Sequence, residues 1–245
     1  MKKKKKDIIL IEFLGLPGCG KTSIVNELVK SLNEKKVIAS SRDYQGKTYT
    51  KLKKYPEFIS LIPFKHLRRL HFYWRKQNYH HFNKKHNIFK KYKEYFNLCR
   101  GLLITNLILK KIKKDFKFLI SDEGTFQHLV FYYQKRLFSY DLESILNTYP
   151  KQRTIFVYLD TEAKSAYSRM KKREKKIRLE EKILQEGNHW GENYYKEAKK
   201  SYERLFAYLE EKEKEKKIKK AIKLDGQKSV EENVKILKDL LNKIK

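Results

Sequence analysis

The chain has 245 residues and a formal net charge of +30, with 40% hydrophobic and 36% charged residues. This length and composition suit one soluble globular domain with a sizeable core. No run approaches the roughly 18 apolar residues of a membrane-spanning helix. The two cysteines, Cys19 and Cys99, imply no disulfide framework and are typical of a reducing, cytoplasmic compartment.

The positive charge is spread along the chain, because lysines occur in almost every segment. A charge of this size would suit nucleic acid, acidic lipid or a polyanionic substrate. We favour a compositional bias instead, because lysine is abundant together with Ile, Asn, Tyr and Phe, and because no compact arginine–aromatic module stands out. Nucleic acid is therefore a possible partner but not the favoured one.

A glycine-rich loop follows a short apolar run and precedes a helical pattern that starts at Ile24. It matches G-x-x-x-x-G-K-[ST], the phosphate loop, in the expected strand–loop–helix setting. The glycines let backbone amides turn toward a polyphosphate, and the next helix directs its positive dipole end at the same oxygens. We expect the nucleotide to be bound by Gly15, Pro17, Gly18, Cys19, Gly20, Lys21, Thr22 and Ser23.

Two side chains of this loop carry chemistry. The ammonium of Lys21 reaches the β- and γ-phosphates as a point charge, and the Thr22 hydroxyl is a ligand for Mg²⁺. The loop therefore predicts binding of a nucleoside triphosphate, with ATP and Mg²⁺ as cofactors.

Lysines at positions 2–6 and the apolar run after them have the outline of an export signal cleaved before Cys19. Asp7 and Glu12 interrupt that apolar run, and the cleavage would cut the phosphate loop in two. We therefore expect no export signal here.

Five short apolar segments alternate with helical patterns, at residues 8–14, 37–39, 116–120, 155–159 and 221–224. The alternation predicts an α/β protein with a five-stranded parallel sheet wound on both faces. Together with the phosphate loop, it indicates a three-layer P-loop NTPase fold with a helical lid insertion. Ligands of such sheets bind beyond the carboxyl ends of the strands, where Asp43, Asp122 and Asp160 follow.

Three helical regions surround this pattern. Residues 49–114 are rich in aromatic and basic side chains and predict helices over the acceptor side of the cleft. Residues 193–217 and 230–244 form amphipathic, highly charged patterns that we expect to be peripheral helices.

Arg169 and Arg173 are four residues apart after the fourth strand, so they share one face of a helix. Two guanidinium groups on a mobile helix suit a transferring phosphoryl group, whose charge spreads over its oxygens. An ordinary basic helix surface is the alternative, because lysines at 164, 171 and 172 lie beside them.

Residues 159–180, which include Arg169 and Arg173, resemble the strand-to-lid region of thymidylate kinases, and residues 224–232 resemble their last strand and helix. The phosphate loop, residues 120–122 and the helix around 202–205 follow in the same order. The resemblance implies the fold of P-loop nucleoside and nucleotide kinases, with both arginines as lid residues near the triphosphate. It also suggests Arg178 as a lid residue.

The acceptor side departs from that family. Thymidylate kinases follow the third strand with Asp-Arg-Tyr, where this chain has Asp122, Glu123 and Gly124. Residues 40–46 replace their Glu-Pro-Gly-Gly segment, and Arg100 is a candidate for their monophosphate-binding arginine. The resemblance therefore does not extend to thymidine monophosphate as the substrate.

An alcohol acceptor also needs a base near its hydroxyl. By the resemblance, related nucleoside kinases keep a carboxylate base where this chain has Asp43. Asp122 would serve as a base or would hold Mg²⁺, and Glu123 is a third candidate; a helix cap or a salt bridge is the alternative for each. His80, His81 and His86 lack the cysteines or HExxH pattern of a zinc site.

The sequence thus predicts one kinase-like domain over residues 1–245, with an acceptor-side insertion at 49–114 and a lid region at 161–190. Its catalytic residues would be Lys21, Asp43, Asp122, Arg169 and Arg173. The function is an ATP-dependent small-molecule kinase that transfers the γ-phosphate to a hydroxyl or phosphate of a nucleotide, nucleoside or sugar-type metabolite. A polynucleotide 5′-hydroxyl kinase and a non-enzymatic nucleotide-dependent binding module are the alternatives, and a homodimer is left open.

Overall fold

The fold was analysed in a computed structural model of the chain. The structure describes residues 8–32, 37–39, 117–122, 124, 126–127, 130, 142–147, 149–150, 152–181 and 191–244. The predicted insertion at 49–114, the candidate base Asp43, the three histidines and Arg100 lie outside these residues.

Within the residues that the structure describes, five strands form one parallel sheet in the order β2-β3-β1-β4-β5. They are β1 (Ile9–Leu14), β2 (Val37–Ala39), β3 (Phe118–Ser121), β4 (Thr154–Asp160) and β5 (Lys220–Asp225). The five-stranded parallel sheet predicted from the sequence is confirmed. β1 is the central strand, and because the sheet is parallel, the carboxyl ends of all five strands lie at the same edge. The loop that follows β1 is therefore flanked by the ends of β3 and β4.

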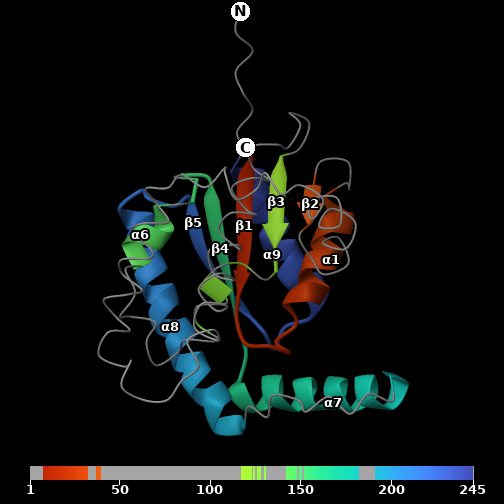
Figure 1. Ribbon diagram of the computed structural model, residues 1–245. Coiled ribbons are helices and arrows are strands. Elements are labelled where there is room, and N and C mark those ends of the chain that lie inside the picture. The colour runs from red at the N-terminus through yellow and green to blue at the C-terminus, as the bar shows by residue number, and fades with distance from the viewer. Residues whose placement is uncertain are drawn as a thin grey trace, which may run out of the picture.

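Helices cover both faces of the sheet (Figure 1). Helices α1 (Lys21–Ser31) and α9 (Val230–Lys243) contact each other on one face, and α8 (Glu192–Lys214) contacts β4 and β5 on the other. The short α6 (Leu142–Leu146) lies near α8. Helix α7 (Ala163–Glu181) crosses below the carboxyl ends of the strands, at the bottom of the view. The result is the predicted three-layer α/β architecture.

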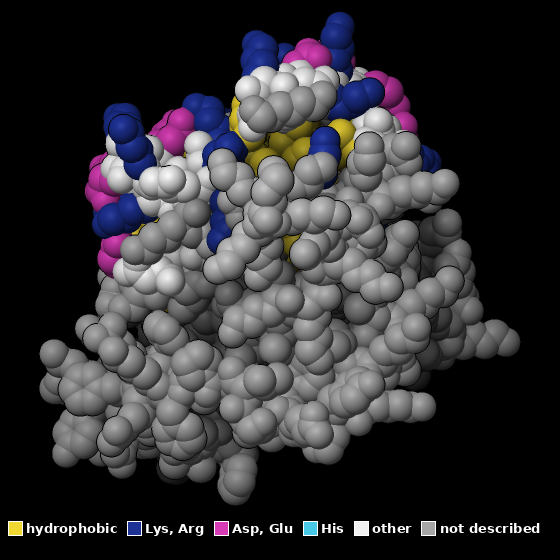
Figure 2. Space-filling model, turned by 90° about the horizontal axis from the view of Figure 1, so that it is seen from above, with side chains coloured by type: hydrophobic (Ala, Val, Ile, Leu, Met, Phe, Trp, Pro, Cys, Tyr) yellow, Lys and Arg dark blue, Asp and Glu magenta, His cyan; other side chains and the backbone are white. Residues whose placement is uncertain are grey.

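The described surface mixes both signs of charge where it is seen from the amino ends of the strands. In Figure 2, lysine and arginine side chains lie among carboxylates rather than in one uniform basic area. Among the helices that the structure describes, none is long and apolar enough to cross a membrane.

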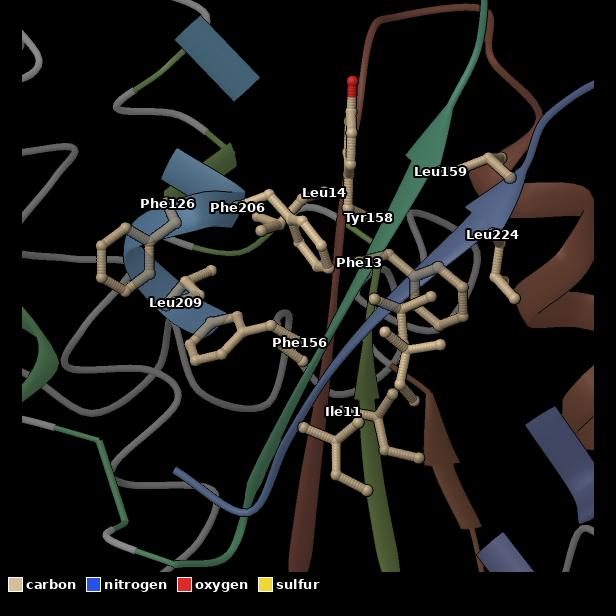
Figure 3. Close-up of a cluster of buried hydrophobic side chains, with 14 of the residues drawn as sticks. Ile11, Phe13, Leu14, Phe126, Phe156, Tyr158, Leu159, Phe206, Leu209 and Leu224 are labelled. Atoms are coloured by element: carbon tan, nitrogen blue, oxygen red, sulfur yellow. The ribbon is translucent and has the colours of Figure 1, made fainter. Parts of the chain in front are cut away.

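The core lies on both sides of the sheet, because successive residues of a strand face opposite ways. In Figure 3, Phe156 and Tyr158 of β4 point to the side of Phe206 and Leu209, while Phe13 and Leu159 point to the other side. The ring of Phe126 meets the ring of Phe156 edge-on, with centroids 5.4 Å apart. β1 and β4 are nearly continuous apolar runs, as expected for strands buried on both faces.

Helix α8 corrects the prediction that the helix at 193–217 is peripheral. Its charged residues occupy one face, while the opposite face enters the core with Tyr195, Ala198, Ser201, Tyr202, Leu205, Phe206 and Leu209. The helix also ends at Lys214, earlier than predicted. The reason is a turn in which Lys216 adopts a φ of 57° and Lys217 N donates to Lys212 O at 2.9 Å.

Candidate functional site

The phosphate loop joins β1 to α1 at the carboxyl edge of the sheet. Helix α1 begins at Lys21 after Gly20, which has a φ of 104° and caps the helix without any side-chain hydrogen bond. The first-turn amides are therefore not used by a capping side chain, and they face the loop with the positive end of the helix dipole. This arrangement is an anion-binding site built from the backbone.

Gly18 brings the loop against α7. Its φ is 80°, and a Cβ atom on this residue would lie 2.5 Å from Ala166 O and 3.2 Å from Met170 N. Only glycine allows this approach, because any side chain would overlap the helix backbone. Helix α7, which lies in the predicted lid region, thus contacts the phosphate loop directly.

Lys21 is buried and its ammonium lies inside the loop. The Nζ atom donates to Gly15 O at 2.7 Å and to Leu16 O at 3.0 Å, and lies 3.6 Å from Cys19 Sγ. The positive charge is therefore held at the centre of the ring of loop residues by loop carbonyls. From there, a small rotation of a flexible side chain would exchange a carbonyl for a phosphate oxygen.

Thr22 and Asp122 meet across the edge of the sheet. The Thr22 hydroxyl donates to Asp122 Oδ2 at 2.9 Å, although the two residues are 100 positions apart. Asp122 follows β3, the neighbour of β1, and the residue is 4% exposed. A hydroxyl and a carboxylate are oxygen ligands of the kind that Mg²⁺ takes.

Mg²⁺ in phosphoryl-transfer sites is held by one or two protein oxygens, with substrate phosphates and water completing its shell. Thr22 and Asp122 fit that donor set. Within the residues that the structure describes, no group of three or more His, Cys, Asp or Glu side chains forms a fuller metal cage.

Asp160 ends β4, but its carboxylate has other partners. Lys199 Nζ lies 3.2 Å from Oδ1 and Lys223 Nζ lies 2.9 Å from Oδ2, and the Tyr158 hydroxyl donates to Oδ1 at 3.3 Å. Partial burial opposes ionisation, but the hydrogen bonds from Lys223 and Lys199 outweigh it and hold the pKa of Asp160 below its ordinary value. Its position at a strand end therefore serves an ion-pair network.

Arg169 and Arg173 lie on α7, and both side chains are exposed. Arg169 stands beside Met170, at the contact between α7 and the phosphate loop, and Arg173 follows one turn later. Arg178 also lies on α7, but its side chain is outside the described residues. The lid role of the arginines remains a prediction.

Sequence reasoning missed Gln127. Its side-chain oxygen accepts a hydrogen bond from Gly15 N at 3.1 Å, and its backbone oxygen accepts one from the Tyr202 hydroxyl at 3.4 Å. Gln127 therefore connects the first residue of the phosphate loop to α8. No local motif marks it, because its partners are 112 and 75 positions away.

Sequence reasoning noticed Glu12 only as an interruption of the apolar run. The side chain is 2% exposed inside β1, where Oε1 accepts from Phe126 N at 3.1 Å and Oε2 accepts from the Tyr149 hydroxyl at 2.7 Å. Burial raises the pKa of Glu12 to about 7, and the hydrogen bonds from Tyr149, Phe126 and Gln127 oppose that rise. The signal for Glu12 in the sequence is an ionisable residue within the apolar run of a central strand, where charged side chains are rarely buried without a role.

Comparison with solved structures identifies the fold. The chain is similar to a structure of deoxyadenosine kinase from M. mycoides with the products dCMP and a flexible dCDP bound. The TM-score is 0.50 at 20% identity, and the match covers 97% of this chain and 100% of that chain. A structure of deoxyadenosine kinase from M. mycoides with bound dCTP gives a TM-score of 0.51 at 18% identity, covering 96% of this chain and 100% of that one.

This likeness shows that the chain has the fold of P-loop nucleoside kinases, which the resemblance in sequence implies. A scan of protein-family models finds no match to the chain, and a search of curated proteins finds none.

Glu12→Gln should stabilise the protein at pH 8 but not near pH 5. With the pKa of Glu12 at about 7 in the folded state and 4.5 ordinarily, the folded state binds more protons than the unfolded state between these values. Wild-type stability therefore falls as pH rises through this window, by up to about 3 kcal/mol from this group. The variant removes the ionisation and keeps both hydrogen bonds, with Tyr149 accepting from the amide.

The measurement is urea unfolding of both proteins at pH 5 and pH 8. The expected result is a gap in unfolding free energy between variant and wild type that opens as pH rises. Parallel pH dependences for the two proteins would show that Glu12 titrates normally.

Proposed function

We propose that the chain is an ATP-dependent kinase that transfers the γ-phosphate to a small-molecule acceptor, with a nucleoside hydroxyl as the favoured acceptor. The observation that supports this most strongly is the hydrogen bond between Thr22 and Asp122 beside the phosphate loop. It joins a candidate metal ligand on α1 to the carboxylate of the residue that directly follows β3, at the edge where ligands of parallel sheets bind.

The likeness in fold to deoxyadenosine kinases favours a nucleoside among the acceptors that the sequence left open. Nucleotides and sugar-type metabolites remain the other members of that class. The described side chains on the face shown in Figure 2 carry both signs of charge, so that face gives no support for nucleic acid as the acceptor. The experiment below must therefore distinguish a small-molecule kinase from a polynucleotide kinase and from a nucleotide-binding module without kinase activity.

Phosphoryl transfer asks the protein mainly for positioning and charge stabilisation. In the proposed reaction, the first-turn amides of α1 and the ammonium of Lys21 hold the β- and γ-phosphates. Thr22 and Asp122 would hold Mg²⁺, which neutralises charge on the phosphate oxygens when bound. Arg169 and Arg173 would approach the same oxygens from α7.

The acceptor oxygen forms a bond to the γ-phosphorus while the bond to the β–γ bridging oxygen breaks, and ADP leaves. A carboxylate takes the proton of an acceptor hydroxyl. Asp43, Asp122 and Glu123 are the candidates for this base, and a carboxylate that holds Mg²⁺ is the weaker base of the set. Asp43 and Glu123 therefore stay as the candidates that do not also hold Mg²⁺, and both lie outside the described residues.

We further propose a cytoplasmic location. The phosphate-loop thiol of Cys19 is buried and free, which suits a reducing compartment. A homodimer stays open as an assembly.

The activity is tested by the transfer of label from γ-labelled ATP with Mg²⁺. Acceptor pools would be nucleosides, nucleoside monophosphates, sugars and a 5′-hydroxyl oligonucleotide. We expect label in the nucleoside pool, and a loss on the order of 100-fold or more in Lys21→Ala, because a preorganised charge at the phosphates is removed.

Label in the oligonucleotide alone would identify the polynucleotide kinase instead. ATP binding with no label in any pool would contradict the kinase and favour the binding module.

Asp122→Asn and Asp160→Asn form a matched pair, since both carboxylates follow strands of the same sheet. Asp122→Asn should lower kcat/KM on the order of 100-fold and raise the Mg²⁺ concentration that gives half-maximal rate, because the carboxylate beside Thr22 loses its charge. Asp160→Asn should leave the Mg²⁺ requirement unchanged, since that carboxylate is bound by Lys199 and Lys223. Equal effects in the two variants would remove Asp122 from the metal site.

A further inference from the structure

The chain after β3 is tied to the phosphate loop at two points. Asp122 accepts from Thr22 at the start of this stretch, and Gln127 accepts from Gly15 N at its end. Thr22 and Gly15 are the far and near ends of the same loop. Asp122 and Gln127 therefore both lie beside the loop, each held by a residue that the proposed function uses.

Glu12 holds this stretch between those two points. Its Oε1 accepts from Phe126 N at 3.1 Å, one residue before Gln127. Gly124 packs against the tip of the same side chain, because a Cβ atom at Gly124 would overlap Glu12 Cδ. The carboxyl group thus sets how closely the stretch approaches β1.

Glu12 itself is fixed from other directions. It lies in β1, opposite Ser121 of β3 and Phe156 of β4, and Tyr149 donates to its second oxygen at 2.7 Å. Among the described residues, its hydrogen-bond partners are one hydroxyl and backbone amides, and no lysine or arginine forms an ion pair with it. A buried carboxyl without a cation costs free energy, so packing alone would favour an apolar side chain here.

We propose that Glu12 is a positioning residue: its carboxyl group holds Gly124, Phe126 and Gln127 against β1 and so places the Asp122 carboxylate beside the Thr22 hydroxyl for Mg²⁺. The proposal rests on the Mg²⁺ site of the proposed function. Glu12 touches neither the nucleotide nor the metal in this scheme, and it acts through the backbone of its neighbours.

The test measures how much Mg²⁺ tightens ATP binding in the full-length protein. The quantity is the ratio of the Kd for ATP in EDTA to the Kd in saturating Mg²⁺, obtained by competition with a fluorescent ATP analogue. Glu12→Leu has a similar volume but offers no acceptor to Phe126 or Tyr149, so we expect the ratio to fall about tenfold. Glu12→Gln keeps both hydrogen bonds and should stay close to the wild-type ratio.

Leu10→Ala is the structural control, because Leu10 is fully buried in β1 two residues before Glu12, and so lies on the same face of the sheet. It should lower stability and leave the ratio unchanged. If Glu12→Leu does not fold, Glu12→Asp replaces it: the charge stays, but the shorter side chain cannot reach both partners, and the ratio should fall as well.

A wild-type ratio in Glu12→Leu or Glu12→Asp would overturn the proposal, and so would an equal fall in Leu10→Ala. The proposal would also be overturned if the Kd of the wild-type protein for ATP were the same in EDTA and in Mg²⁺. Phosphoryl transfer is scored separately: a wild-type protein with a normal Mg²⁺ effect and no transfer would contradict the kinase and leave the role of Glu12 standing.

Discussion

Strand β1 is hydrogen-bonded on both sides, to β3 and to β4, and the site depends on this central placement. Because the pairing is parallel, the ends of all three strands reach the same edge of the sheet. The phosphate loop leaves from β1 at that edge, with Asp122 on one side and Asp160 on the other. A small displacement of β1 would move the loop relative to both carboxylates.

The two sides of β1 use their carboxylates differently. On the β3 side, Asp122 is buried and bonded to Thr22, next to the loop. On the β4 side, Asp160 is bound by two lysines, from α8 and β5. Ion pairing holds the charge of Asp160 in place, and the Thr22 hydroxyl donates to Asp122. The proposed metal site therefore lies on the β3 side of β1.

A network of hydrogen bonds between buried polar groups lies next to the phosphate loop. Glu12, Gln127, Tyr149 and Tyr202 connect β1, the chain after β3, and α8 through hydrogen bonds. Such networks cost free energy unless they are satisfied, and when satisfied they specify one arrangement. The same core that stabilises the sheet therefore fixes the backbone that carries Asp122.

The sequence was sufficient for the parts that rest on local patterns. The phosphate loop has fixed spacing, and the strands are short apolar runs with polar residues at their ends, so the sheet and the position of Asp122 were predictable. Helix α8 was misjudged because its charge count hid the regular spacing of its buried residues, from Tyr195 to Leu209. Gln127, the lysine partners of Asp160 and the partners of Glu12 depend on contacts between residues far apart in the chain, which no local pattern reports.

In the proposed function, the loop from Gly15 to Ser23 binds a polyphosphate through its amides and Lys21. The most direct measurement is a calorimetric titration of the protein with ATP, ADP and AMP in the presence of Mg²⁺. We expect affinity to increase with the number of phosphates, with AMP by far the weakest ligand, because each added phosphate contacts more of the loop. Equal affinities for AMP and ATP would contradict it, since the nucleotide would then be held by its base and sugar and not by this loop.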